Sequence, residues 1–232
     1  MTKLIDAVIP AAGVGRRMGA ALPKQYLKLG RITVLERSCA IFLNDPSIEH
    51  VIVALSPDDD VFDALSLAKH PKIIKAPGGK ERCDSVRNAL SLSSADYVLV
   101  HDAARPLLSK RDLENLKKAA FASKNGALLA CPVADTVKKS KEVSKDLFAS
   151  FSTVPRHDLW RALTPQMFER EMLVSSLDLA KQQGLTVTDE ASALEILGKT
   201  PVLVSSFDPN FKLTTPEDLL MAKALLQYKG EL

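Results

Sequence analysis

Short apolar runs and helical spacings alternate along most of the chain. The apolar runs predict buried strands at residues 4–9, 50–56, 72–75, 97–100 and 202–206. Helical patterns predict helices at about 34–44, 59–68, 81–92, 113–120, 165–183 and 189–197, and a last helix that starts at 215–218. Continuous apolar strands separated by helices are typical of parallel strands covered on both faces. The pattern therefore predicts an α/β fold, with a doubly wound, mostly parallel sheet and helices on both faces.

The segment from about 134 to 156 departs from this pattern. Its central run, 138–146, is too polar for a core, and it lies between apolar runs at 127–133 and 151–154. This arrangement predicts a projecting, hairpin-like β-arm, for which a plain surface loop is the alternative. Because the sequence has no internal repeat, we expect a single domain over residues 1–232 that carries this arm.

The composition excludes several classes of protein. The 232 residues are 46% hydrophobic and 25% charged, close to the average of globular domains. A formal net charge of +3 is too small to favour binding to nucleic acid or to a membrane surface. No apolar run approaches the ~20 residues of a spanning helix, and the first ten residues contain an acid and a proline where a signal peptide needs an apolar core. We expect neither nucleic acid nor membrane as a partner.

Cysteine usage indicates the compartment. Cys39, Cys83 and Cys131 are odd in number, far apart and in no metal-ligand spacing. Such usage is typical of a reducing environment. We therefore expect a cytoplasmic protein without a zinc site.

The segment 10–26 carries the clearest candidate chemistry. It follows the first predicted strand, at the edge where open α/β sheets bind ligands, and its glycines and alanines would let backbone N–H groups approach phosphate oxygens. The stretch from Ala7 to Leu35 contains no acid and five basic residues, which are Arg16, Arg17, Lys24, Lys28 and Arg31. This charge predicts a polyanion site in which Arg17 and Lys24 function. For Lys28 and Arg31 a solvated basic turn is the alternative.

Two common phosphate motifs do not fit this segment. No stretch matches G-x-x-x-x-G-K-[ST], and Gly13, Gly15 and Gly19 form G-x-G-x-x-x-G, one position longer than the dinucleotide fingerprint. Arg16 and Arg17 would also crowd a close helix–pyrophosphate contact. The pattern therefore disfavours a nicotinamide cofactor.

A series of short motifs runs in order from one end of the chain to the other. The motifs lie at 11–18, 23–26, 78–86, 101–106, 135–138, 162–166, 188–193 and 212–218. The first, Ala-Ala-Gly-x-Gly-x-Arg-Met, marks nucleotidyltransferases broadly. The complete series resembles that of the 2-C-methyl-D-erythritol 4-phosphate cytidylyltransferases, enzymes of the non-mevalonate isoprenoid pathway. The resemblance implies a Rossmann-like nucleotidyltransferase fold.

The reaction implied by this resemblance joins CTP to 2-C-methyl-D-erythritol 4-phosphate. The substrate phosphate attacks the α-phosphate in line, which gives 4-diphosphocytidyl-2-C-methyl-D-erythritol and pyrophosphate. A phosphate monoester has a second pKa of about 6, so the nucleophile is already ionised and needs no general base. The sequence agrees, since it shows no Ser–His–Asp or Cys–His pattern. The remaining difficulty is electrostatic, and fixed cations and a metal ion address it.

The resemblance implies roles for the charged residues. Arg17 and Lys24 would hold the triphosphate and stabilise charge at the α-phosphorus, and Lys212 would be the third cation near the reacting phosphates. Asp102, directly after a predicted strand, would bind Mg²⁺. Arg105 would contact phosphate or substrate, for which a structural ion pair is the alternative.

The nucleotide site implied by the resemblance consists mainly of small residues. It comprises Ala11, Ala12, Gly13, Gly15, Gly79, Arg82, Ser85 and Ala104. Glycine would expose the backbone to the cytosine edge, and the Ser85 hydroxyl could donate or accept, with helix capping as its alternative. Lys80 and Asp208 depart from the family's pattern and are given no role, and His101 is expected only to pack or hydrogen-bond.

The acceptor site implied by the resemblance comprises Thr136, Arg156, Thr164 and Thr188. In relatives the arm reaches across a homodimer, so Thr136 and Arg156 would complete the site of the second subunit. The planar guanidinium of an arginine suits phosphate, while a surface salt bridge is the alternative for Arg156.

Two other functions of the protein stay open. One is a ribitol 5-phosphate cytidylyltransferase, and the other is a non-catalytic nucleotide-binding protein.

Overall fold

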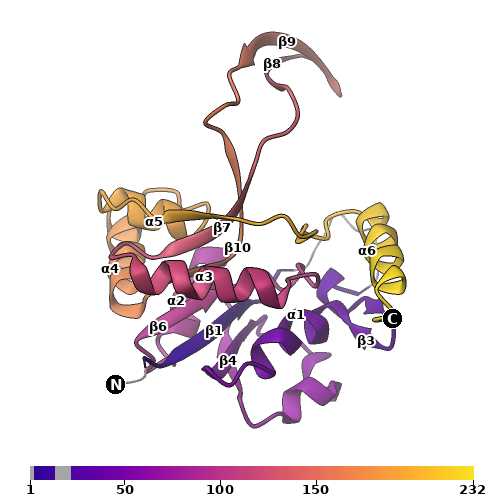
Figure 1. Cartoon of the computed structure of the whole chain (residues 1–232), viewed down its shortest axis with the longest axis vertical. Coiled ribbons are helices and arrows are strands. Elements are labelled where there is room, and N and C mark those ends of the chain that lie inside the picture. Colours follow the sequence, from indigo (N-terminus) through magenta and orange to yellow (C-terminus); the bar gives the residue numbers. More distant parts are fainter. Residues whose placement is uncertain (1–2, 14–21) are drawn as a thin grey trace.

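A seven-stranded sheet in the order β11-β7-β10-β6-β1-β4-β5 organises the computed structural model, which describes residues 3–13 and 22–232 (Figure 1). Its strands are β1 (Ile5–Pro10), β4 (Ile48–Leu55), β5 (Ile73–Pro77), β6 (Tyr97–Val100), β7 (Ala127–Pro132), β10 (Trp160–Glu169) and β11 (Val202–Ser205). β10 is antiparallel to β6 and β7, and the other pairings in this sheet are parallel.

The helices are α1 (Val34–Leu43), α2 (Arg82–Leu90), α3 (Lys110–Ala122), α4 (Arg170–Gln182), α5 (Glu190–Ile196) and α6 (Pro216–Tyr228). The last begins as predicted, because Thr215 caps it, Pro216 occupies its first turn and Asp218 completes a capping box. None of the described helices is both long and apolar enough to cross a membrane.

Alternating side chains of the central strands build a core on each face of the sheet. In β1, Ile5, Ala7 and Ile9 pack with α1 and α3, whereas Val8 packs with α2 and α4. A smaller apolar cluster holds α6 against Leu29 of the short strand β2 (Lys28–Leu29), which pairs with β3 (Ile32–Thr33). The predicted doubly wound α/β class is confirmed.

The helix predicted at 165–183 is wrong in its first part. Residues up to Glu169 belong to β10, and α4 begins only at Arg170. Pro165 begins the predicted helix but does not begin the observed one. It lies instead where the register of β10 against β7 shifts, between Ala162 and Gln166, a place where a strand tolerates proline.

The helix predicted at 59–68 is also wrong. The chain forms two short 3₁₀ turns, η3 (Phe62–Ala64) and η4 (Ser66–Lys69). The Asp59 carboxylate accepts the backbone N–H groups of Val61 and Phe62, at 3.2 and 3.0 Å. Such local side-chain bonds compete with a continuous helix.

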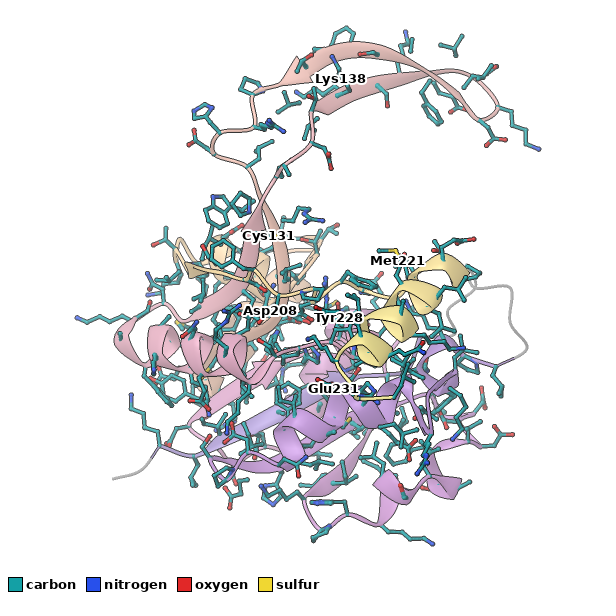
Figure 2. All side chains as sticks on the ribbon, turned by 45° about the vertical axis from the view of Figure 1, so that its right-hand side comes forward. Cys131, Lys138, Asp208, Met221, Tyr228 and Glu231 are labelled. Carbon is teal, nitrogen blue, oxygen red and sulfur yellow. The ribbon has the colours of Figure 1, made fainter. Side chains whose placement is uncertain are left out.

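The arm is a β-hairpin that projects from the body (Figure 1). It pairs β8 (Val137–Ser144) with β9 (Leu147–Val154), and Figure 2 shows Lys138 on it, away from Cys131 near its base. Its side chains are mostly exposed, including Phe151 at 77%. The segment is therefore the predicted β-hairpin and not a plain surface loop.

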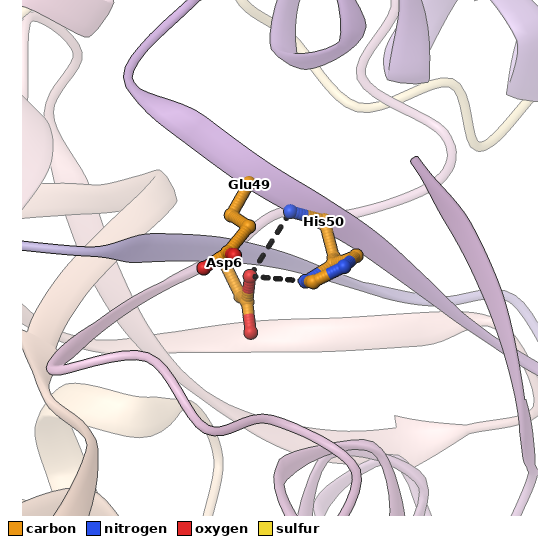
Figure 3. Close-up of side chains that lie close together, drawn as sticks. All are labelled: Asp6, Glu49 and His50. Atoms are coloured by element: carbon orange, nitrogen blue, oxygen red, sulfur yellow. Dashed lines mark hydrogen bonds and ion pairs between the residues drawn. The ribbon is translucent and has the colours of Figure 1, made fainter. Parts of the chain in front are cut away.

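A buried aspartate fixes the register at the amino ends of β1 and β4 (Figure 3). Ile5 pairs with Ile48 but Asp6 pairs with His50, so Glu49 is the extra residue of a β-bulge. The Asp6 carboxylate accepts the His50 backbone N–H at 3.0 Å and lies 3.3 Å from His50 Nδ1. Its other oxygen accepts the Ser93 hydroxyl at 2.7 Å, so donors within the fold satisfy this carboxylate.

Candidate active site

A cleft of about 400 Å³ lies at the carboxyl ends of β1 and β6. The chain passes from β1 to β4 on one side and later to β6 on the other, so this edge is the switch point where open α/β sheets bind ligands. Ten of the predicted site residues line it. They are Ala11, Ala12, Gly13, Lys24, Gly79, Arg82, Ser85, Asp102, Ala104 and Lys212.

The other predicted site residues lie beside the cleft, on the arm or outside the described part of the chain. Arg105 and Thr164 contact Asp102 from behind the cleft lining. Thr136 and Arg156 flank the arm strands and are exposed, and Thr188 is exposed just before α5. Gly15 and Arg17 lie outside the described residues.

Asp102 is the electrostatic centre of the cleft. One carboxylate oxygen accepts Arg82 Nε at 3.2 Å, and the other accepts Arg105 Nε at 3.2 Å and lies 3.0 Å from Lys212 Nζ. Burial alone raises the pKa of this carboxyl, but the three cations outweigh burial and hold the pKa well below its ordinary value. Asp102 is therefore ionised, and the cations around it exceed its charge.

Arg82 bridges two carboxylates. Its Nη1 and Nη2 contact both oxygens of Glu190, at 2.6 and 3.2 Å, while its Nε contacts Asp102. Burial lowers the pKa of the guanidinium, but the charges of Glu190 and then Asp102 raise it above its ordinary value. Arg82 therefore carries a fixed positive charge at the cleft wall.

A buried hydrogen-bond chain supports Asp102 from behind. The Asp102 backbone N–H donates to Thr164 Oγ1 at 3.0 Å, and that oxygen lies 3.0 Å from His101 Nδ1. His101 Nε2 lies 3.0 Å from the Arg105 carbonyl oxygen, which only accepts. Burial lowers the pKa of His101 to about 4, so the ring is neutral, with the proton on Nε2, and the Thr164 hydroxyl donates to Nδ1. His101 is thus a hydrogen-bonding neighbour, as predicted.

Gln25 shapes the described part of the loop after β1. Its buried side chain donates to the carbonyl oxygens of Ala11 and Gly13, at 2.8 and 3.2 Å. It belongs to the 3₁₀ turn η2 (Lys24–Tyr26), which places Lys24 in the cleft lining. Lys24 Nζ donates to the carbonyl oxygen of Leu213 at 2.9 Å, next to Lys212. The first loop and the segment before α6 therefore present their lysines together.

The turn before α2 requires glycine. A Cβ on Gly79 would lie 2.2 Å from Asp84 Cβ, closer than packed atoms allow. The Ser85 hydroxyl accepts the Gly79 N–H at 2.9 Å, while Glu81 occupies the N-cap. The alternative interpretation, in which Ser85 caps the helix, is therefore wrong, because this hydroxyl holds the turn at Gly79 instead.

Arg105 forms a structural ion pair, which was the alternative to a contact with phosphate or substrate. Besides Asp102, it donates from Nη1 to the Asn210 carbonyl oxygen at 2.8 Å. Asp208, which was given no role, ion-pairs with Arg111 at 3.0 Å and does not line the cleft. Lys80, also left without a role, does line the cleft.

Sequence reasoning missed the residues that hold the site from behind. These are Gln25, Gln166, Glu190 and Asn210. Gln25, Gln166 and Glu190 stand within motifs of the resemblance, yet their polar character alone suggested no partner. The sequence offered one indication of a buried charge. Glu190 stands beside small residues that form the buried face of a helix, so its carboxylate would need a cationic partner.

Comparison with known proteins identifies the family. The family model for 2-C-methyl-D-erythritol 4-phosphate cytidylyltransferase matches residues 5–228. The chain belongs to the 2-C-methyl-D-erythritol 4-phosphate cytidylyltransferase family.

The similarity to members of the cytidylyltransferase family covers nearly the whole chain. A relative from Klebsiella pneumoniae subsp. pneumoniae is 50% identical over 223 residues, which are 96% of this chain and 93% of the relative. One from Vibrio vulnificus is 46% identical over 231 residues, or 97% and 95%. The crystal structure of the Francisella tularensis 2-C-methyl-D-erythritol 4-phosphate cytidylyltransferase has a TM-score of 0.82 and 34% identity, over 95% of this chain and 99% of that one. The family predicted from the motifs is confirmed.

Proposed function

We propose that this chain transfers CMP from CTP to 2-C-methyl-D-erythritol 4-phosphate, releasing pyrophosphate and 4-diphosphocytidyl-2-C-methyl-D-erythritol. Family membership supports this acceptor over ribitol 5-phosphate. The observation that carries the chemistry is the set of cations that lines or adjoins one cleft: Lys24, Arg82, Arg105 and Lys212. Two anionic reactants can meet there because fixed positive charge lowers their repulsion.

The cleft suits a nucleophile that is already ionised. Among its described lining residues there is no histidine or cysteine, and the neighbouring His101 is neutral and buried. A phosphate monoester is largely dianionic at neutral pH, so no side chain has to remove a proton from it. Lys24 and Lys212, with Arg17, would hold the phosphates in line and stabilise the charge that builds on the α-phosphate and the pyrophosphate.

The donor set fits a magnesium ion held by Asp102. This carboxylate is ionised and borders the cleft, and Mg²⁺ usually takes one or two protein carboxylates besides waters and phosphate oxygens. When bound, Mg²⁺ would neutralise phosphate charge. Because three cations already contact Asp102, we expect tight metal binding only together with the triphosphate. Titration calorimetry should therefore show weak binding of Mg²⁺ alone, and strong binding of Mg²⁺ alone would contradict this expectation.

The acceptor assay tests the proposed substrate. Purified protein is incubated with CTP, Mg²⁺ and either 2-C-methyl-D-erythritol 4-phosphate or ribitol 5-phosphate, and pyrophosphate release is measured. Faster turnover with the methylerythritol phosphate is expected. Faster turnover with ribitol 5-phosphate would overturn the acceptor, and CTP binding without turnover would indicate a non-catalytic nucleotide-binding protein.

The arm supports a proposal that the active unit is a homodimer with shared sites. Thr136 and Arg156 flank a hairpin that projects from the body with exposed phenylalanines at 148 and 151, a surface that a second copy could cover. Phosphate from the acceptor would then meet Arg156 of one subunit and Thr188 of the other, while the Thr164 hydroxyl is held behind the cleft by Asp102 and His101. A cytoplasmic location stays a prediction from the three unpaired cysteines.

Subunit mixing tests the shared site. Arg17→Ala and Arg156→Ala variants, each inactive, are mixed under conditions of verified subunit exchange. Half of the dimers are then mixed, and each has one intact site, so activity should recover to roughly a quarter of wild type. No recovery would contradict the shared site while leaving the proposed reaction intact.

A further inference from the structure

Glu190 is a buried charge with a two-point contact to the cleft. It is the first residue of α5 and only 1% exposed. Its carboxylate oxygens accept both terminal nitrogens of Arg82, 108 positions earlier in the chain, at 2.6 and 3.2 Å. A buried carboxylate is costly unless it is paired, so this arrangement ties α5 to the cleft wall.

The fold fixes the backbone on both sides of Glu190. Gln166 of β10, also buried, accepts the Ala191 N–H at 2.8 Å and donates to Asp189 at 2.9 Å. Asp189 in turn caps α5 by accepting the Ser192 N–H at 2.9 Å. The backbone around Glu190 is therefore held by the central strand β10, and its carboxylate offers Arg82 a fixed partner.

The contacts of Arg82 divide into two kinds. Nε contacts Asp102, whose carboxylate is shared with Arg105 and Lys212 and is the group suited to a metal. The two terminal nitrogens contact Glu190, which does not line the cleft. The Glu190 contact is therefore separate from the carboxylate that a metal would share.

We propose that Glu190 is a positioning residue for nucleotide binding, which fixes the guanidinium of Arg82 at the cleft wall before CTP arrives. This inference rests on the proposed function, because it takes the anion in the cleft to be CTP. A pre-ordered arginine binds phosphate or ribose oxygens without first losing its side-chain freedom. Glu190 also lies two residues after Thr188. The turn that is predicted to contact the acceptor therefore also holds Arg82, which is predicted to contact the nucleotide.

The test measures CTP binding without an acceptor, by titration calorimetry in Mg²⁺ with folded wild-type and variant protein. Glu190→Gln keeps the shape but removes the charge, and should raise the Kd for CTP about 10- to 100-fold, the range for a lost charged hydrogen bond. Asp178→Asn is the matched control. It breaks the two-point pair of Arg87, also on α2, with contacts of 2.7 and 2.9 Å, yet neither residue lines the cleft. Its Kd should match that of wild type.

A double-variant cycle separates positioning from a general structural role. If Glu190 acts through Arg82, then Arg82→Gln with Glu190→Gln should bind CTP no more weakly than Arg82→Gln alone. This pair also removes the buried charge of Glu190 together with its partner, so it should fold even where one change alone does not. Multiplying effects of the two changes would overturn the proposal.

The remaining outcomes are also decisive. If Glu190→Gln does not fold, Glu190→Asp keeps the charge but shortens the side chain, and should weaken CTP binding several-fold because both bonds cannot be kept. An unchanged Kd in whichever variant folds would overturn the positioning role. Failure of wild-type protein to bind CTP would instead overturn the proposed function.

Discussion

Two buried aspartates at opposite ends of the same sheet have opposite electrostatic surroundings. Asp6, near the start of β1, is 1% exposed, and its oxygens accept a backbone N–H and a hydroxyl, with one imidazole nearby (Figure 3). Asp102, after β6, is 6% exposed and contacts two arginines and a lysine. Burial is nearly the same in the two cases, but the partners differ in kind.

This difference distinguishes a buried carboxylate that only stabilises the fold from one that belongs to a ligand site. The amino end satisfies its carboxylate with fixed donors of the fold, so it has no need of a ligand. At the carboxyl end, more positive charge gathers than one carboxylate balances, and it borders an open cleft. An anion that enters can therefore gain from charges that the fold already holds in place.

Neutralising Asp102 should have the largest effect. Asp102→Asn removes the carboxylate suited to the metal and the counter-charge that orders the cations, so turnover should fall about 10³-fold. Steady-state pyrophosphate release measures this, after circular dichroism confirms the fold. Asp6→Asn is the matched control and should keep near wild-type turnover. Equal losses in both variants would break the distinction between the two ends.

Removing a cation of the cleft also tests whether the carboxyl end of the sheet is the functional end. Lys24→Ala should lower turnover about 10²–10³-fold, the loss expected when one transition-state contact is removed, and Arg17→Ala should do the same. The comparison variant is Lys28→Ala, a lysine of the same basic stretch that is exposed and outside the cleft lining. A similar loss in Lys28→Ala would mean that net charge, not position, matters.

The loop before β4 holds a second structural carboxylate, Asp45. Lys117 Nζ lies 2.6 Å from it, and both side chains are 9% exposed. Lys117→Met should lower the free energy of unfolding by about 2–3 kcal/mol, less than for a fully broken buried pair because Ser47 still bonds to Asp45. Chemical denaturation measures the loss, and turnover of the folded variant should be unchanged.

The pH dependence of that loss has a definite sign. Burial raises the pKa of Asp45, but hydrogen bonds from Lys117 and Ser47 outweigh it and hold the pKa below its ordinary value. The pair therefore stabilises the fold above the ordinary aspartate pKa of about 4, and this contribution is lost as the pH falls below it. The gap between wild type and Lys117→Met should shrink at acid pH, and a gap that widens would contradict this assignment.

The smallest effect should come from Asp6→Asn. An asparagine oxygen can still accept the His50 N–H, and the Ser93 hydroxyl can turn to accept from the new amide, so we expect a loss of only about 1 kcal/mol. Thermal unfolding measures it. A much larger loss would mean that the carboxylate charge itself, through His50, holds the two strands together.

Much of the cleft could be predicted from sequence because its parts follow local patterns. Lys24 and Asp102 come after apolar runs that read as strands, and parallel strands bring their carboxyl ends to one edge. Glu190 could not be found this way, since its partner Arg82 lies 108 residues away and nothing local connects them. Strand β10, whose Gln166 orders α5, was missed as well, because the helix predicted at 165–183 overlaps the end of this strand.

A structure of the complex with CTP and Mg²⁺ would show directly whether the cation-lined cleft is the catalytic site. We expect the triphosphate in the cleft at the carboxyl ends of β1 and β6, within hydrogen-bond distance of Lys24 Nζ and Lys212 Nζ, and the metal on Asp102. A nucleotide bound at the Asp6 end of the sheet, or anywhere outside this cleft, would contradict this expectation.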